Sequence, residues 1–366
     1  GKKPGKVSLP RDIAPADPHA GHLRILSNMS IQRSGTNAIC TFNALYEHWR
    51  SVLDISILNK TFFQEIARFF YQLTGGKIQQ GAKTYSFEGQ LHLPSVAADD
   101  AKTHQEFAVR LIGRLIFCWF LKHKGSSEGK PLLPGNLLSP ERVRNSPKYY
   151  HSILEKLFFE ILNTPPEKRQ KNILPEADSV PFLNGGLFEP HKKDFYAPQY
   201  INTLKIPDDW FSDFLEMLNG YVFTIAENTP LDEEVAVDPE ILGRIFENLL
   251  AEINPETGET ARKQTGSYYT PREIVDYMVS QSLVYYLHDK TSIDEDTLNG
   301  LLSHTGEDVE LSTSQRDAVI RALDEIKILD PACGSGAFPM GMLQKMLVVL
   351  QRVDPESKRW LELKLA

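Results

Sequence analysis

The sequence feature that most constrains the fold is a short apolar run followed by an acidic residue and a glycine-containing turn. Ile326 to Leu329 has Lys327 as its only charge, is too short for a helix, and ends at a turn signal. This pattern predicts a buried strand. Asp330 follows the run directly, and Gly334 and Gly336 lie in the turn. A strand that leads into such a turn is typical of an α/β unit.

A helix is predicted directly after this turn. From Ala337 to Leu350, apolar residues recur at helical spacing: Phe338, Met342, Leu343, Met346, Leu347 and Leu350. In open α/β sheets, ligands lie outside the carboxyl ends of the strands, where a helix N-terminus offers free N–H groups. Glycine lets the backbone approach such a ligand closely. The sequence therefore predicts a nucleotide-type site at this turn.

The residues of the turn narrow the class of ligand. Asp330 suits a ligand that carries an ammonium group or hydroxyls, and it would repel a phosphate. The turn reads Gly-Ser-Gly, so it matches neither the Gly-x-Gly-x-x-Gly pattern of dinucleotide sites nor the P-loop pattern. Both points favour S-adenosylmethionine over NAD or ATP. Taken alone, however, such a turn is more often an ordinary connection between a strand and a helix.

A second stretch, earlier in the chain, begins another helix. Thr270 and Glu273 form a capping box, with Pro271 at the first helical position. We expect this helix to run from Pro271 to about His288. Its inner face is expected to carry Ile274, Met278 and Leu283.

Together the two stretches resemble a known pair of motifs. Gly266 to Pro271 reads Gly-Ser-Tyr-Tyr-Thr-Pro, and Asp330 to Phe338 reads Asp-Pro-Ala-Cys-Gly-Ser-Gly-Ala-Phe. They closely resemble motif X and motif I of gamma-class adenine-N6 DNA methyltransferases, in which motif X comes first. Three more stretches look like the helical region before motif X in large type IIG restriction-modification enzymes, which have BREX phage-defence methylases as close relatives: Phe107 to Gly125, Phe182 to Glu189, and Phe223 to Leu250.

The resemblance implies a role for the residues of both motifs. Tyr268, Tyr269 and Thr270 would line the methionine end of S-adenosylmethionine. Asp330 would contact the ammonium group of this cofactor, directly or through water. The close backbone wall of the site would come from Ala332, Cys333, Gly334, Ser335 and Gly336. Pro339 departs from the family pattern, in which an aliphatic residue is usual, but proline is tolerated in a first helical turn.

The patterning and the resemblance predict a mainly α-helical fold in two domains. Residues 1–235 would form a helical N-terminal or connector domain, and residues 236–366 the incomplete start of a Rossmann-like α/β methyltransferase domain. The family's catalytic Asn/Asp-Pro-Pro-Tyr/Phe motif grips a flipped adenine, lies beyond motif I, and does not occur in this sequence. We therefore expect no catalytic residue here and a fragment that is inactive alone.

The first domain is expected to contain several helices. Arg110 and Arg114 in one of them could face phosphates, although a solvated or salt-bridged helix face is the more usual arrangement. Gly75 and Gly76 are expected to end the first helical region. The expected elements are helices at Asn43 to Tyr71, His104 to Lys124 and Tyr149 to Asn163, a hairpin or loop at Lys77 to Asp100, a strand at Tyr221 to Ile225, and an acidic loop at Asp232 to Asp238.

Composition sets the broad class of the protein. The chain has 366 residues, of which 41% are hydrophobic and 24% charged, as in an ordinary globular protein of about two domains. Its net charge of −8 gives no overall attraction to nucleic acid. The resemblance implies double-stranded DNA as the partner, so contact with DNA needs a local basic patch or parts of the protein absent here. The sequence does not indicate an oligomeric state.

Other classes of site are not expected. Cys40, Cys118 and Cys333 are far apart, so a disulfide framework or zinc site is improbable and a reducing cytoplasm is the simplest location. The longest apolar run is too short to span a bilayer. His19 and His22 have no third ligand at a suitable spacing, so no metal is expected.

Two other functions stay open from the sequence. The chain could be a non-catalytic helical module that binds DNA or positions other domains of a larger restriction enzyme. It could also belong to a methyltransferase that acts on protein or RNA, since related Asn-Pro-Pro-Tyr enzymes modify glutamine. The large helical region before motif X argues against this last function.

Overall fold

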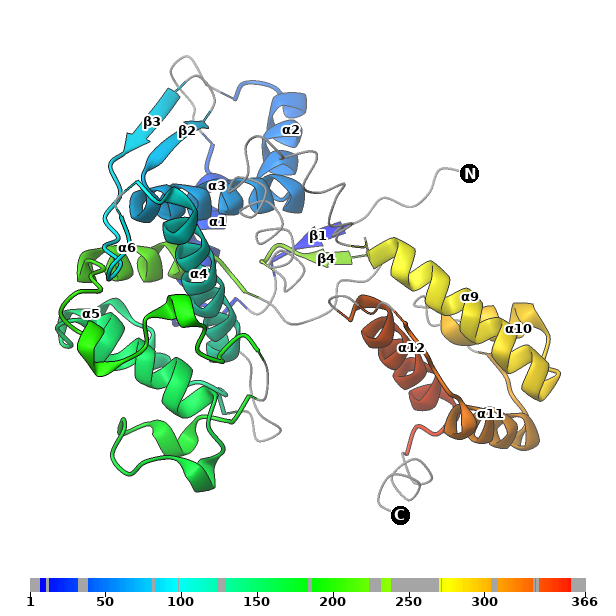
Figure 1. Cartoon of the computed structure of the whole chain (residues 1–366). Coiled ribbons are helices and arrows are strands. Elements are labelled where there is room, and N and C mark those ends of the chain that lie inside the picture. The colour runs from blue at the N-terminus through cyan, green and yellow to red at the C-terminus, as the bar shows by residue number, and fades with distance from the viewer. Residues whose placement is uncertain are drawn as a thin grey trace. The chain divides into compact units, whose positions relative to one another are not determined.

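The structure is a computed structural model of the chain. It describes residues 7–10, 13–31, 39–80, 83–97, 99–123, 130–183, 186–223, 232–237, 270, 272–303, 309–331, 333 and 336–356. The chain divides into two compact units (Figure 1). Unit 1 comprises Gly1–Asn228 and Asp232–Ser267, and unit 2 comprises Thr229–Leu231 and Tyr268–Ala366. The expected domain boundary between residues 235 and 236 stays a prediction, because residues 238–269 lie outside the described part.

Helices dominate both units, which confirms the expected mainly α-helical fold. The α-helices of unit 1 are α1 (Ala20–Asn28), α2 (Phe42–Val52), α3 (Ile55–Thr74), α4 (Ala101–His123), α5 (Pro140–Arg144) and α6 (Asp208–Asn219). Its strands are β1 (Val7–Leu9), β2 (Gly76–Gln80), β3 (Lys83–Phe87) and β4 (Asp232–Glu234). Its short helical turns are η1 (Gly135–Leu137), η4 (Pro166–Lys168), η5 (Ala177–Ser179), η6 (Lys192–Asp194) and η7 (Pro198–Tyr200). Two π-helical stretches, η2 (Tyr150–Leu154) and η3 (Lys156–Leu162), also lie in the described part of unit 1.

Helix α4 forms the centre of the core of unit 1. The helix expected at His104 to Lys124 is confirmed, and the side chains predicted for its apolar face are all buried: Phe107, Leu111, Leu115, Cys118 and Trp119. Burial extends beyond this predicted face, because Ile112, Ile116 and Arg114 are also covered. A helix buried on nearly all sides lies inside a domain rather than on its surface. The helix expected at Tyr149 to Asn163 packs into the same core with π-helical hydrogen bonding.

The region expected as one helix from Asn43 to Tyr71 is two helices. Helix α2 begins at Thr41, whose hydroxyl accepts a hydrogen bond from the Ala44 N–H at 3.2 Å. Helix α3 begins after Asp54, whose carboxylate accepts one from the Ile57 N–H at 3.4 Å. Both residues are N-caps of the type that helices prefer. An acidic cap inside the apolar pattern therefore explains the break that the spacing alone did not reveal.

Two glycines end α3 as predicted. Gly75 and Gly76 have φ values of 78° and 128°, which other residues rarely adopt. The chain then forms the antiparallel hairpin β2–β3, in which Gly76 pairs with Phe87 and Gln80 with Lys83. The hairpin that was one of two possibilities for Lys77 to Asp100 is thus confirmed.

Unit 1 also contains a short parallel pair, β1 with β4, in which Val7 pairs with Asp232. The acidic loop expected at Asp232 to Asp238 is therefore wrong where β4 pairs with β1. Backbone hydrogen bonds between the strands stabilise these short segments whatever their side chains. The strand expected at Tyr221 to Ile225 is reduced to a bridge between Phe223 and Val237, and residues 224 and 225 lie outside the described part.

Unit 2 consists of α9 (Arg272–Thr291), α10 (Glu295–Leu302), α11 (Thr313–Glu325) and α12 (Ala337–Val353), as Figure 1 shows. Local signals begin two of these helices. The Asp294 carboxylate accepts a hydrogen bond from the Thr297 N–H at 2.8 Å and caps α10. Ser312 and Gln315 form a capping box at the start of α11. The four helices share one apolar core, which includes Leu283, Leu287, Leu298, Val319, Val349 and Val353.

The helices after the two motifs are confirmed, but the face predicted for α9 is wrong. Ile274 and Met278 are each 49% exposed, whereas Val275 and Val279 are buried. Only Leu283 of the predicted set lies in the core. Because α9 packs on α10, α11 and α12, its buried face is decided by tertiary contacts rather than by its most apolar side chains.

The predicted strand at Lys327 to Leu329 is also wrong. Residues 326–330 form no regular element, Ile328 is 49% exposed, and Leu329 is 87% exposed. A strand requires a neighbour that pairs with its backbone groups. In the described part of the chain, β1 pairs with β4 and β2 with β3, and residues 326–330 take part in neither ladder. A Rossmann-like sheet therefore stays a proposal.

Candidate functional site

The structure describes part of the predicted site. Thr270 is half-buried just before α9, and it lies outside any strand. Asp330 is half-buried and Cys333 is exposed in the segment before α12, and Gly336 is the N-cap of that helix. The remaining predicted residues lie outside the described part: Tyr268, Tyr269, Ala332, Gly334 and Ser335.

The helices that follow the two motifs, α9 and α12, pack against each other in parallel. A side chain at Gly341 would place its Cβ 2.6 Å from Cγ1 of Val275, so the helices touch here through glycine. The same number of residues separates Thr270 from Val275 and Gly336 from Gly341. Both helices begin at the same end of unit 2 (Figure 1). The starts of the two helices thus lie at one end of this unit, as a shared site requires.

Gly336 adopts a backbone conformation that glycine alone adopts readily. Its φ of 84° and ψ of 18° are left-handed. Its N–H donates to the Cys333 carbonyl at 2.7 Å, and its own carbonyl accepts from the Met340 N–H at 2.9 Å. These two bonds close the turn and begin α12. A Cβ at Gly336 would meet no atom within 4 Å, so space lies open beside this backbone.

The beginning of α12 is chemically suited to a polar ligand. Glycine has no side chain with which to cap a helix, so the N-cap residue Gly336 makes no side-chain bond to the first N–H groups of α12. The helix dipole adds partial positive charge at this end. Asp330 adds a carboxylate in the same segment. The site therefore combines donors with one acidic group, a set that matches the carboxylate and the ammonium of an amino acid.

Lys345 is a site-supporting residue that the sequence reasoning missed. Its side chain is only 5% exposed, and its ammonium lies 2.7 Å from Oδ1 of Asp276 in α9. The same group donates to the Leu302 carbonyl at 3.3 Å, at the end of α10. One lysine thus joins α12 to both α9 and α10. The sequence contained a signal that Lys345 is buried. It stands four residues after Gly341 and four before Val349, and both of these lie on the packed face of α12.

Arg352 makes a second connection between α12 and α10. Its guanidinium donates to the carbonyls of Gly300, Leu301 and Ser303 at 2.7 to 2.9 Å. Basic groups at a helix C-terminus satisfy its last carbonyls and its dipole. Lys345 and Arg352 together hold α12 in place along its length.

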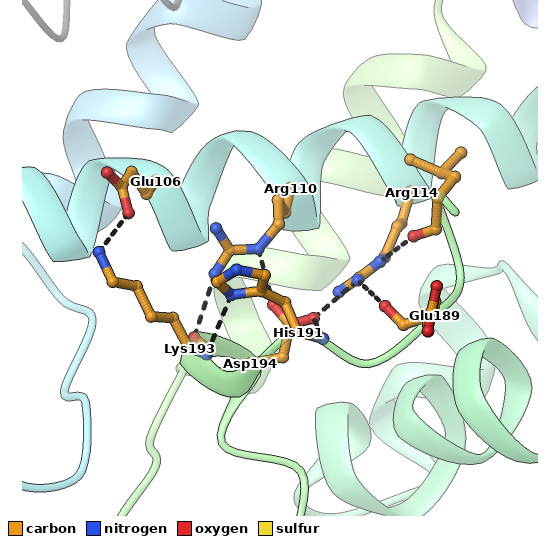
Figure 2. A network of polar contacts seen from close by, with 8 residues as sticks. Glu106, Arg110, Arg114, Glu189, His191, Lys193 and Asp194 are labelled. Atoms are coloured by element: carbon orange, nitrogen blue, oxygen red, sulfur yellow. Dashed lines mark hydrogen bonds and ion pairs between the residues drawn. The ribbon is translucent and has the colours of Figure 1, made fainter.

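The arginines of α4 do not face phosphates. Arg114 donates to Oδ2 of Asp194 at 2.7 Å, and Arg110 donates to Oδ1 of the same residue at 2.8 Å (Figure 2). Arg114 also donates to the carbonyls of Leu187 and Glu189. The more usual expectation, a salt-bridged arginine face, is confirmed. The cluster fastens the segment from Leu187 to Asp194 onto α4.

The two arginines keep the carboxylate of Asp194 in its ionised form. Burial raises the pKa of Asp194, but the hydrogen bond and charge of Arg114, with the Arg110 and His191 bonds, outweigh burial and lower it. Lys193 and Glu106 form a further ion pair at 2.6 Å (Figure 2). Because the carboxylate of Asp194 stays ionised between two guanidiniums, the cluster is a structural connection and not an open binding site.

The two histidines considered as metal ligands have other surroundings. Nδ1 of His19 accepts a hydrogen bond from the Gly21 N–H at 3.0 Å and caps α1. His22 is buried in α1, where a loop was expected. In the described ranges, no group of three or more His, Cys, Asp or Glu side chains is arranged to hold a metal ion. Among the same residues, no helix is both long and apolar enough to cross a membrane.

Comparison with known proteins bears on the class of this chain. The chain is similar to a protein of Methanocaldococcus jannaschii named "Putative type II restriction enzyme and methyltransferase". The two are 32% identical over 266 residues, which cover 68% of this chain and 21% of the archaeal protein. The chain thus resembles a restriction-modification methyltransferase. It spans about a fifth of the length of that relative. No protein-family model and no solved structure matches the chain.

Proposed function

We propose that this chain carries the S-adenosylmethionine-binding motifs of an adenine-specific DNA methyltransferase in a restriction-modification or phage-defence system. The observation that carries the proposal is the parallel packing of α9 and α12. The two helices follow two separate sequence motifs, and both begin at one end of unit 2. Chance motif matches would have no reason to lie on adjacent helices in this way.

The proposed roles follow from the chemistry of each group. S-adenosylmethionine supplies a methyl group on a sulfonium. The carboxylate of Asp330 would bind its ammonium, and the backbone from Ala332 to Gly336 would form the wall against which it lies. Tyr268, Tyr269 and Thr270 would line the methionine end. The left-handed Gly336 and the open space beside it fit this arrangement, since a larger residue would strain the turn.

The archaeal relative supports the same class of protein. Its name includes both a restriction enzyme and a methyltransferase. Double-stranded DNA is accordingly the proposed partner. The choice of adenine rests on the resemblance of the two motifs to the gamma class. The type IIG or BREX setting of the protein rests on the same resemblance.

The site as proposed needs residues that this sequence does not contain. The motif that grips a flipped adenine is absent from it. The segment before Asp330 is exposed and pairs with no strand in the described part. We infer that the 366-residue chain alone binds S-adenosylmethionine weakly and transfers no methyl group.

One observation favours a second candidate, a helical module that positions other parts of a restriction enzyme. The core of unit 1 is extensive and is fastened by the buried pair of Arg114 and Asp194. Such a rigid unit would serve as a connector whether or not unit 2 binds a cofactor. Cofactor binding by the natural protein decides between the two candidates.

The direct test is calorimetric titration of S-adenosylmethionine into the natural protein that contains this sequence. Asp330→Ala is expected to weaken binding at least about tenfold, as expected for the loss of a charge-assisted contact. Asp324→Ala is the matched control, because Asp324 is an exposed carboxylate on α11. Equal affinity of the Asp330 variant and the control, or no binding by the wild type, would contradict the proposed site.

A further inference from the structure

The first turn of α1 is capped by a histidine. His19 precedes the helix as its N-cap, and its Nδ1 accepts a hydrogen bond from the Gly21 N–H at 3.0 Å. The usual N-cap residues accept such a bond with a side-chain oxygen. A ring nitrogen accepts only while it carries no proton, because an imidazolium donates from both nitrogens. The cap therefore requires the neutral ring of His19.

Two further imidazoles lie beside His19. The centre of its ring is 6.1 Å from that of His22 in the same helix and 5.9 Å from that of His123 at the end of α4. Lys122 precedes His123, and its ammonium lies 3.9 Å from the centre of the Trp119 ring. We call His19, His22, His123 and Lys122 the basic cluster. It joins the beginning of α1 to the end of α4.

The basic cluster gives His19 no acidic partner. Among the described residues, no carboxylate forms a hydrogen bond or an ion pair with His19. Asp17, two residues earlier in the chain, is exposed. Glu65 of α3 is engaged at the following turn of α1, where it pairs with Arg24 at 3.4 Å and accepts from the Tyr221 hydroxyl at 2.6 Å. A proton on His19 would therefore gain no counter-charge from these groups.

The surroundings of His19 favour its neutral form. Burial lowers the pKa of His19 below its ordinary 6.5, and the charges of His22 and Lys122 lower it further. The N-terminus of α1 adds partial positive charge beside the ring. Protonation of His19 is thus disfavoured in the folded protein, and it would remove the acceptor of the cap.

The first turn of α1 has little polar support besides this cap. A Cβ at Gly21 would lie 2.6 Å from the Val222 nitrogen, so the helix touches the segment after α6 through glycine. His22 is buried in the same turn, and neither of its ring nitrogens has a hydrogen-bond partner in the described part of unit 1. Because the first N–H groups of a helix have no partner within the helix, their cap decides whether this turn stays formed.

We propose that His19 is a proton-sensitive cap, which holds the first turn of α1 against the end of α4 while its ring is neutral and releases this turn when protonated. The stabilisation by the neutral ring is present above pH 6.5 and is lost as the pH falls through the lowered pKa of His19 in the folded state. This device lies in unit 1 and is independent of cofactor binding by unit 2.

The test is amide hydrogen exchange of the natural protein that contains this sequence, followed by mass spectrometry at about pH 7.5 and about pH 5.5 and corrected for the intrinsic effect of pH. Protection of Ala20–Asn28 is expected to fall about threefold to tenfold at the lower pH. About tenfold is the limit at that pH for one imidazole whose pKa is the ordinary 6.5 once the turn is released.

Two variants separate the cap from general effects of acid. His19→Asn keeps an acceptor that does not titrate in this range, so its protection of α1 should change by less than about twofold between the two pH values. His92→Asn is the matched control and should behave like the wild type. His92 is an exposed histidine of unit 1 outside the basic cluster.

The pKa of His19 in the wild type is a second measurement. Deuterium exchange at the C2 position of each imidazole reports the pKa of that histidine, and a value below 6.5 is expected for His19. This value decides the matter if His19→Asn already fails to protect α1 at about pH 7.5. A pKa of 6.5 or above for His19, unchanged protection of α1 in the wild type, or the same pH dependence in His19→Asn as in the wild type would each overturn the inference.

Discussion

The ammonium of Lys345 lies 2.7 Å from Oδ1 of Asp276, and this ion pair joins the two helices that follow the two methyltransferase-like motifs. The pair is asymmetric, because the side chain of Lys345 is 5% exposed and that of Asp276 is 44% exposed. The buried ammonium of Lys345 is therefore stabilised more by this ion pair than the half-exposed carboxylate of Asp276 is. Lys345 lies one helical turn after Gly341 on α12, and Asp276 directly follows Val275 on α9. The ion pair and the Gly341–Val275 contact together fix how the two helices align.

The asymmetry predicts unequal costs for the two halves of the pair. Asp276→Asn removes the negative charge that lies 2.7 Å from a buried ammonium, and we expect it to lower the free energy of unfolding by about 2 kcal/mol. Lys345→Met replaces the buried group by an apolar one of similar length and leaves a carboxylate that water can reach, so its cost should be below about 1 kcal/mol. Urea denaturation of both variants measures this difference. A larger cost for Lys345→Met would contradict the proposed asymmetry.

Close packing at Gly341 gives a second prediction. Gly341→Ala should destabilise the protein by about 1–3 kcal/mol, because its Cβ would overlap Cγ1 of Val275. Val275→Ala removes that methyl group, so the double variant should recover most of the loss caused by the alanine at 341. Gly186→Ala is the control, since a Cβ there meets nothing within 4 Å. Additive effects in this double-mutant cycle would show that the two residues do not touch.

His151 gives a prediction about pH. Burial lowers its pKa, but hydrogen bonds to Glu155 and to the Leu204 carbonyl, with the charge of Glu155, outweigh burial and raise the pKa above its ordinary 6.5. Nδ1 lies 2.7 Å from Oε2 of Glu155, and Nε2 lies 3.0 Å from the Leu204 oxygen. Both partners accept hydrogen bonds, so the doubly protonated imidazolium satisfies them best.

The sign of the effect follows from the raised pKa. The stabilisation by protonated His151 is fully present below pH 6.5 and is lost as the pH rises through the folded-state value. The difference in unfolding free energy between wild type and His151→Gln should therefore be larger at about pH 6 than at about pH 8.5. Nuclear magnetic resonance titration of the ring, with Glu155→Gln as comparison, should show the lower pKa in the variant. A pKa below 6.5 in the wild type would contradict this account.

Local sequence patterns predicted where helices lie better than they predicted which helix faces are buried. The capping box at Thr270 and the apolar spacing after Gly336 located α9 and α12 correctly. The buried face of α9 was displaced by one position, since Val275 is buried where Ile274 was expected. Which side of a helix is covered depends on its neighbours, and a single sequence does not contain their positions.

Contacts between distant residues were the least predictable part. Arg114 and Asp194 form the buried pair of unit 1 although 80 residues separate them. Lys345 and Asp276 are a similar case in unit 2. The strand predicted before Asp330 failed for a related reason, because a strand depends on a neighbour that local sequence does not show.

Methyl transfer by the natural protein that contains this sequence tests the central claim most directly. The protein is incubated with unmethylated bacterial DNA and S-adenosylmethionine labelled in its methyl group, and the DNA is digested to nucleosides and separated. We predict that the wild-type protein places the label in N6-methyladenine. The label should be lost with Gly334→Val, because a branched side chain would occupy the volume of the cofactor. The label should be retained with the control Asp324→Ala. We also predict no label with the 366-residue chain alone. Label in cytosine, full activity of Gly334→Val, or transfer by the chain alone would contradict the account.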